Sequence, residues 1–208
     1  MPIAVDEFRV ADAPDVWRSA GFNVDPDGVC RIGDVRVRLL GDGIGIVGWT
    51  LRELPVDGNL DGVPTSRSDA APAAPATHAN GVTSIDHVVL LSPNLARTVS
   101  SLGAVGLQPR RERDAELGGQ PMRQVFFRLG SVILEVVGAP GVADDGPSSL
   151  WGITYVVADI DATAAFFGDR TLPVKDAVQP GRRITTLRHR DLGMSVRTAM
   201  ISPPILSR

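Results

Sequence analysis

Short apolar stretches and short helical segments alternate along the chain. Residues 85–91 and 129–138 are apolar and rich in β-branched side chains, which is typical of buried strands. A further strand is expected over residues 45–54, and another around 107–113. Helices are expected over residues 16–20, 95–102 and 160–167, because each segment is followed by a glycine that can end it. The pattern predicts an α+β protein with short helices.

One unit of this pattern is repeated. Residues 30–41 align without gaps on residues 127–138, and residues 190–201 form a weaker third copy. Each copy has a glycine at the turn between two strands, where a tight hairpin favours positive φ. The alignment places Arg38 and Thr198 at the position of Glu135. Spacing from the following strand places Gly152 at the position of His87, and the first copy has Asp6 or Glu7 near that position.

The repeats divide the chain into three parts. Residues 1–57 form a truncated N-terminal unit, and residues 58–82 form a linker rich in alanine and proline that we expect to be extended and mobile. Residues 83–208 contain two paired units, over 83–140 and 150–203. A half-unit at the N-terminus leaves strand edges unpaired, so we expect it to join the same assembly or to pair in a homodimer.

Composition and charge exclude several classes of protein. The chain has 208 residues and a formal net charge of −3, which gives no reason to expect nucleic acid or an anionic membrane as a partner. It has neither a long apolar span nor an opening signal peptide, so the cytoplasm is the expected location. Its single cysteine, Cys30, excludes an intramolecular disulfide.

Two polar residues interrupt the apolar strands of the middle unit. His87 lies in the first strand and Glu135 in the last. A carboxylate inside an apolar strand needs a partner, which is either a metal ion or an arginine. Side chains alternate along strands, so His87 and Glu135 converge if their strands lie in one sheet with these faces on the same side. Two ligands suit an open metal site that leaves positions for water or substrate.

This arrangement resembles the vicinal oxygen chelate superfamily, which includes glyoxalases, bleomycin-resistance proteins and extradiol dioxygenases. Residues 84–90 and 151–161 carry the resemblance, with a weaker echo in residues 5–54. It implies repeated βαβββ units that form a cupped mixed or antiparallel sheet around a divalent metal. Carried over by position, the first-strand histidine is His87 and the last-strand glutamate is Glu135. The donor types do not select among Mn, Fe, Zn, Ni and Mg. Gly152 and Thr198 depart from the pattern, because neither is a good ligand.

Other polar residues are expected near this site. Arg182 and Arg183 follow a turn, and alternation allows one of them to point into the cup, where it would neutralise Glu135 or bind an anionic group. Gln124 and Phe126 share one face of a strand and are expected to line the cup. We assign catalytic roles to Glu135 and Arg183, and substrate contacts to Gln124, Phe126, Arg182 and Arg183. The arginines at positions 110, 111, 113 and 123 could bind a substrate carboxylate or phosphate, but a solvated hairpin face is the favoured interpretation, because acidic residues are interleaved with them.

The sequence favours a divalent-metal-assisted enzyme of isomerase, lyase or dioxygenase type that acts on a small oxygen-rich metabolite. Loss of ligands at Gly152 and Thr198 favours an alternative, a metal-free protein that binds and sequesters a small molecule, as bleomycin-resistance proteins do. The third possibility is a degenerate structural subunit, whose cup would be filled by side chains.

Overall fold

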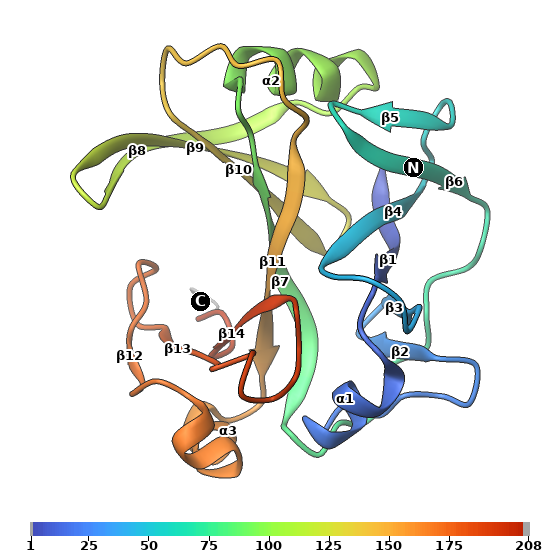
Figure 1. Cartoon of the computed structure of the whole chain (residues 1–208), viewed down its shortest axis with the longest axis vertical. Helices are drawn as coiled ribbons and strands as arrows, with labels where there is room; N and C mark the ends of the chain where they lie inside the picture. The colour runs from blue at the N-terminus through green and yellow to red at the C-terminus, as the bar shows by residue number, and fades with distance from the viewer. Residues whose placement is uncertain (1, 206–208) are drawn as a thin grey trace.

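The computed structural model describes residues 2–205, which form two mixed β-sheets (Figure 1). The N-terminal sheet has the order β2-β3-β1-β4-β6-β5. Its elements are β1 (Ala4–Val10), α1 (Pro14–Ser19), β2 (Val29–Ile32), β3 (Val35–Leu39), β4 (Ile46–Arg52), β5 (Gly58–Leu60) and β6 (Val63–Ser68).

The C-terminal sheet has the order β12-β13-β14-β11-β7-β10-β9-β8. Its strands are β7 (Val82–Leu91), β8 (Pro109–Leu117), β9 (Gln120–Leu129), β10 (Val132–Gly138), β11 (Ser149–Val157), β12 (Lys175–Asp176), β13 (Arg183–Thr186) and β14 (Arg197–Ile201). Its helices are α2 (Leu95–Ala104) and α3 (Ile160–Phe167), the latter followed by a 3-10 turn, η1 (Gly168–Arg170).

Both sheets are built from two units of the same topology. In the C-terminal sheet, the first strands β7 and β11 pair antiparallel at the centre, and each also pairs in parallel with the last strand of its own unit. The N-terminal sheet repeats this with β1 and β4 at the centre, paired in parallel with β3 and β6. The predicted α+β fold of repeated units in a cupped sheet is confirmed. The strand predicted over residues 45–54 opens a fourth unit, which has no helix in the structure.

The linker is shorter than predicted. Residues 58–68, assigned to it from their composition, form β5 and β6, because Leu60 and Val63 bury their side chains in the core. Residues 69–81 are irregular but lie along the N-terminal sheet, where the Ala73 and Ala76 amides donate to the carbonyls of Asp34 and Arg31. The first unit is therefore partnered within the chain, which removes the reason given for a homodimer.

One hydrophobic core joins the two sheets. It includes Trp17 and Phe22 beside the N-terminal sheet and Tyr155 on β11 of the C-terminal sheet. The ring centroid of Tyr155 lies 6.4 Å from that of Trp17 and 5.4 Å from that of Phe22. Because the core occupies one face of the C-terminal sheet, the cup is formed by the other face, between β8–β9 and β12–β13 on the left in Figure 1.

Two buried aspartates also fasten the halves together. Asp12, which precedes α1, accepts hydrogen bonds from the indole N–H of Trp17 at 2.9 Å and the amide of Ser195 at 3.0 Å. Asp61, in the turn between β5 and β6, accepts from Arg97 on α2 and from the Ser148 hydroxyl at 2.6 Å. Each carboxylate is satisfied by donors from distant segments, so it ties the N-terminal half to the C-terminal half.

No helix within residues 2–205 combines the length and apolar character required to cross a bilayer.

Candidate functional site

A β-bulge in β7 shapes the centre of the cup. Along the pair of β7 and β11, Ile85 lies opposite Tyr155 and His87 lies opposite Thr154, so Asp86 is one extra residue. A bulge breaks the alternation of side chains between the two faces of a sheet. The carboxylate of Asp86 therefore reaches the ring of its own neighbour, with 2.8 Å between Asp86 Oδ2 and His87 Nδ1.

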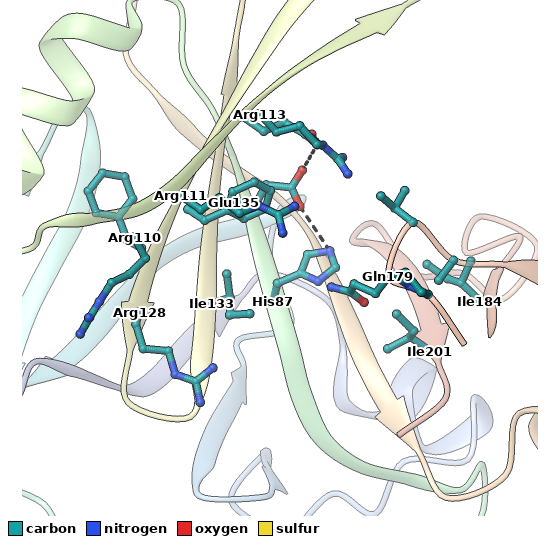
Figure 2. Close-up of a pocket in the computed structure, with 16 residues that line it drawn as sticks. His87, Arg110, Arg111, Arg113, Arg128, Ile133, Glu135, Gln179, Ile184 and Ile201 are labelled. Atoms are coloured by element: carbon teal, nitrogen blue, oxygen red, sulfur yellow. Dashed lines mark hydrogen bonds and ion pairs between the residues drawn. The ribbon is translucent and has the colours of Figure 1, made fainter. Parts of the chain in front are cut away.

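The cup contains a cavity of about 490 Å³ that is lined by both units of the C-terminal sheet (Figure 2). From the first unit come His87, Gln124, Phe126 and Glu135, together with several arginines. From the second unit come Ile184, Ile201 and the loop that contains Gln179. The first unit therefore supplies the polar and cationic wall, and the second supplies a largely apolar one.

A chain of polar contacts leads across the first unit to His87. Arg113 Nε donates to Gln124 Oε1 at 2.7 Å, and Gln124 Nε2 donates to Glu135 Oε1. The other carboxylate oxygen, Glu135 Oε2, lies 3.6 Å from His87 Nε2 (Figure 2). Both side chains are mostly buried. Glu135 thus has an amide donor on one side and the imidazole ring on the other.

The series of polar contacts continues on the far side of His87. Arg182 Nη1 lies 2.7 Å from Asp86 Oδ1, and both side chains are less than a tenth exposed. Burial alone would raise the pKa of Asp86, but hydrogen bonds with His87 and Arg182 outweigh it and lower the pKa below its ordinary value. Arg182 also donates twice to the Ser202 carbonyl, at 2.7 and 2.9 Å. The second unit thereby holds the carboxylate that orients His87.

The geometry around His87 fits a cation between its ring and Glu135. An ionised Asp86 fixes the proton on Nδ1, which turns the lone pair of Nε2 toward the Glu135 carboxylate. Two acceptors then face each other at 3.6 Å, so His87 and Glu135 are the side chains that would hold a divalent cation here. A proton on Nε2 is the other way to compensate the carboxylate, at a distance too long for a hydrogen bond. Among residues 2–205 no cluster of three or more His, Cys, Asp or Glu side chains suits a metal, so the protein offers two ligands here.

The structure brings most of the predicted site residues together. His87, Gln124, Phe126 and Glu135 all line the cavity. Arg182 lies beside it and pairs with Asp86, not with Glu135 as considered from the sequence.

Arg183 is the exception, and its predicted place in the site needs correction. Its guanidinium makes two contacts with the carboxylate of Asp161 on α3, at 2.7 and 2.9 Å, and it is exposed. Strand alternation sends Arg182 inward and Arg183 outward, so the structure gives Arg183 no contact with the cavity.

The second unit supplies no ligand at the matching positions. β11 has its own bulge at Trp151, just before Gly152, as Asp86 comes just before His87. A Cβ at Gly152 would lie 2.8 Å from the carbonyl oxygen of Arg197, so the close approach of β14 restricts this position to glycine. The residue that matches Glu135 is Ala199. Gly152 lies opposite Arg197 in the pair of β11 and β14, and Ala199 comes two positions after Arg197. In the same way, His87 lies opposite Ile133, and Glu135 comes two positions after Ile133.

Thr198, aligned with Glu135 from the sequence, is one residue out of register. Its side chain is buried on the core side of β14 and donates to the Val196 carbonyl at 3.0 Å. The turn before β14 is longer than the two-residue turn between β9 and β10, which the gapless alignment did not allow for.

Sequence reasoning missed Asp86 and undervalued the arginines of β8 and β9. The cavity is lined by Arg110, Arg111, Arg113 and Arg128. Strict alternation along 110–116 would have separated Arg111 and Arg113 from the acidic residues between them. No signal in the sequence marks the bulge at Asp86.

Comparison with solved structures agrees with this architecture. A triple mutant of 4-hydroxymandelate synthase from Streptomyces coelicolor superposes with a TM-score of 0.69 and 15% identity, over 100% of this chain and 94% of that one. A xylose isomerase-like TIM barrel/4-hydroxyphenylpyruvate dioxygenase fusion protein gives a TM-score of 0.62 and 13% identity, over 100% of this chain and 50% of that one. Methylmalonyl-CoA epimerase from Mycobacterium tuberculosis gives a TM-score of 0.47 and 16% identity, over 60% and 91% of the two chains.

No protein-family model matches the sequence, and no curated protein matches it significantly. The full-length structural matches and the unit topology establish that the chain has the fold of the vicinal oxygen chelate superfamily. At these identities the likeness defines the fold, and the activity has to be argued from the site.

Proposed function

We propose that the protein is a divalent-metal-assisted enzyme that acts on a small oxygen-rich metabolite in the C-terminal cup. The observation that carries this proposal is the pair His87 Nε2 and Glu135 Oε2, which face each other at 3.6 Å inside an open cavity. Asp86 holds the ring in the orientation that a metal-binding histidine needs. The solved structures with the same fold include enzymes named as a synthase and a dioxygenase, which supports an enzyme in general terms.

Each residue of the polar chain has a role in this proposal. A divalent ion bound by His87 and Glu135 would supply Lewis-acid stabilisation to neighbouring substrate oxygens, as an isomerase, lyase or dioxygenase requires. Asp86 keeps the proton on Nδ1 of His87, and Arg182 keeps Asp86 ionised and in place. Gln124 fixes one oxygen of Glu135 and leaves the other free to bind the ion. The donor set does not choose among Mn, Fe, Zn, Ni and Mg.

A metal-free protein that sequesters a small molecule is the second candidate. It is favoured by Gly152 and Ala199, which leave the second unit without ligands. In that case Glu135 would need a cationic partner from the protein, yet its contacts are with Gln124 and His87. A structural subunit is disfavoured, because the cup holds a cavity of about 490 Å³.

Metal content separates the first two candidates. The purified protein is analysed by inductively coupled plasma mass spectrometry as isolated and after incubation with Mn, Fe, Ni and Zn. The enzyme proposal predicts near-stoichiometric metal in the wild type, and its loss in His87→Ala and Glu135→Ala. His189→Ala and Glu116→Gln are matched controls, because both side chains lie outside the cavity. Wild-type protein that binds none of these metals would leave the sequestering protein as the better account.

A cytoplasmic location and a homodimer stay predictions. Size-exclusion chromatography with light scattering measures the second of these directly.

A further inference from the structure

Charges on β8 are sorted by face. Arg111 and Arg113 point into the cavity, whereas Glu112, Asp114 and Glu116 alternate with them and lie outside it. A bulge at Arg110 adds a third arginine, because Pro109 and Arg111 pair with consecutive residues of β9 while Arg110 has no partner. Arg128 on β9 is the fourth. In Figure 2 the side chains of Arg110 and Arg128 lie apart from the His87–Glu135 pair.

These guanidinium groups have no carboxylate partner among residues 2–205. Arg111 lies over the ring of Phe126, with 5.1 Å between its Cζ and the ring centroid. Arg113 uses Nε for Gln124, and its terminal nitrogens make no hydrogen bond or ion pair with any residue in the range 2–205. In contrast, Arg123 on β9 lies outside the cavity and pairs with Asp114 at 2.8 Å. Glu135 is the one carboxylate among the described residues that line the cavity.

We infer that the substrate carries an oxyanion group, of phosphate or carboxylate type, which Arg111 and Arg113 bind on the wall formed by β8. Arginine binds such groups through paired N–H donors, and two residues on one strand face are about 7 Å apart, a spacing that lets both contact one group. This inference rests on the proposed function in one respect, that the reacting part of the same substrate lies at His87 and Glu135.

The opposite wall constrains the rest of the molecule. Ile184, Ile201 and Val178 line it, and Figure 2 shows Ile184 and Ile201 on the far side of His87 from the labelled arginines. Arg182, the buried arginine of this unit, is occupied by Asp86. Among residues 2–205, those that form this wall offer apolar contact and no free cation. We therefore expect the substrate to be anionic at one end and apolar at the other.

Anion binding is measured on metal-free protein in EDTA, so that it does not depend on the metal. The probes are inorganic phosphate and malonate, titrated by isothermal calorimetry and by thermal shift at constant ionic strength. The variants are Arg111→Gln and Arg113→Gln. The matched control is Arg67→Gln, which makes the same change in net charge. Arg67 is an exposed arginine on β6 that lies outside the cavity. Circular dichroism checks that all variants fold.

The inference predicts saturable binding of at least one probe and a weakening of at least tenfold in each cavity variant, with Arg67→Gln unchanged. Preference for phosphate or for malonate tells which oxyanion the substrate carries, and equal binding supports the shared chemistry. Absence of saturable binding to both probes would overturn the inference, as would an equal loss in Arg67→Gln. Either failure would leave the metal content of the protein, and hence the proposed function, unaffected.

Discussion

Glu7 and His87 occupy equivalent positions in the two sheets. Glu7 lies opposite Arg36 in the parallel pair of β1 and β3, as His87 lies opposite Ile133 in the pair of β7 and β10. Each directly follows a bulged aspartate, Asp6 or Asp86. The same backbone arrangement thus presents a side chain at the centre of both sheets.

The side chains that face Glu7 and His87 differ in charge. Arg38 Nε lies 3.0 Å from Glu7 Oε2, whereas Glu135 Oε2 lies 3.6 Å from His87 Nε2. The N-terminal sheet closes the position with an ion pair inside the chain. The C-terminal sheet leaves two metal-ligand types facing each other, which is the contrast expected between a structural copy and a functional one.

Arg38 and Glu135 are the equivalent partners of Glu7 and His87, and we predict that neutralising them has opposite effects on stability. Arg38→Gln leaves the mostly buried Glu7 without its cation, so we expect a loss of about 1 kcal/mol in the free energy of unfolding. Glu135→Gln removes an uncompensated carboxylate, so the metal-free protein is expected to be at least as stable as the wild type. Urea unfolding in EDTA measures both. A larger loss in Glu135→Gln than in Arg38→Gln would show that Glu135 is structural.

Asp86 is predicted to act as a positioning residue for metal binding. Asp86→Asn keeps the shape of the side chain but removes the charge that fixes the proton on Nδ1 of His87. Metal affinity should fall by about 10–100-fold, the range found for residues that orient metal ligands. Calorimetric titration with Zn²⁺ or Mn²⁺ measures the change. The control is Asp161→Asn, which breaks the exposed pair with Arg183 and should leave affinity unaltered.

Gly152 is predicted to be required by backbone crowding. A Cβ there would meet the Arg197 carbonyl oxygen at 2.8 Å, so Gly152→Ala should destabilise the fold by about 1–3 kcal/mol. Gly58→Ala is the matched control, because Gly58 also lies in a strand but a Cβ there would meet nothing within 4 Å. Denaturant unfolding compares the two. Equal stability of both variants would contradict the explanation that backbone crowding restricts position 152 to glycine and so excludes a metal ligand there.

His78 is predicted to make stability fall in mild acid. Burial, the largest cause, lowers the pKa of this histidine below its ordinary value of 6.5, so it is neutral in the folded protein. Below pH 6.5 the unfolded chain takes up a proton that the folded chain does not, and stability decreases as pH falls. Urea unfolding between about pH 8 and pH 5 should show this decrease.

The variant His78→Gln tests the assignment, since glutamine does not titrate. Its stability should depend less on pH than that of the wild type, even if its absolute stability is lower after loss of the hydrogen bond from the Asn23 amide. An unchanged pH dependence would assign the effect to another group. One such group is His189, whose pKa is also lowered, by burial first and then by nearby arginines.

The sequence predicted the repeated unit, the fold class and the convergence of His87 with Glu135. These predictions rest on strand alternation and on the gapless alignment of the repeats. The register of the structure places Arg38 and Glu135 at equivalent positions, as that alignment did. The fourth unit was not recognised, because β4 has no helix after it and the polar composition of residues 58–68 resembled a linker.

The remaining errors have local causes. The bulge at Asp86 breaks the alternation from which side-chain directions were inferred, so the link from Arg182 to His87 was not foreseen. The longer turn before β14 shifted the alignment by one residue, from Ala199 to Thr198. The alternation along β8 was readable from the sequence, but its acidic residues made the whole strand resemble a solvated surface.

Pulsed electron paramagnetic resonance of bound Mn²⁺ tests the central claim most directly, because it detects nitrogen atoms coordinated to the metal. If His87 and Glu135 hold the metal, the wild-type protein shows coupling to one imidazole nitrogen. That coupling disappears in His87→Gln and persists in His189→Gln. A spectrum without nitrogen coupling, or coupling that survives in His87→Gln, would contradict the site described for the cup.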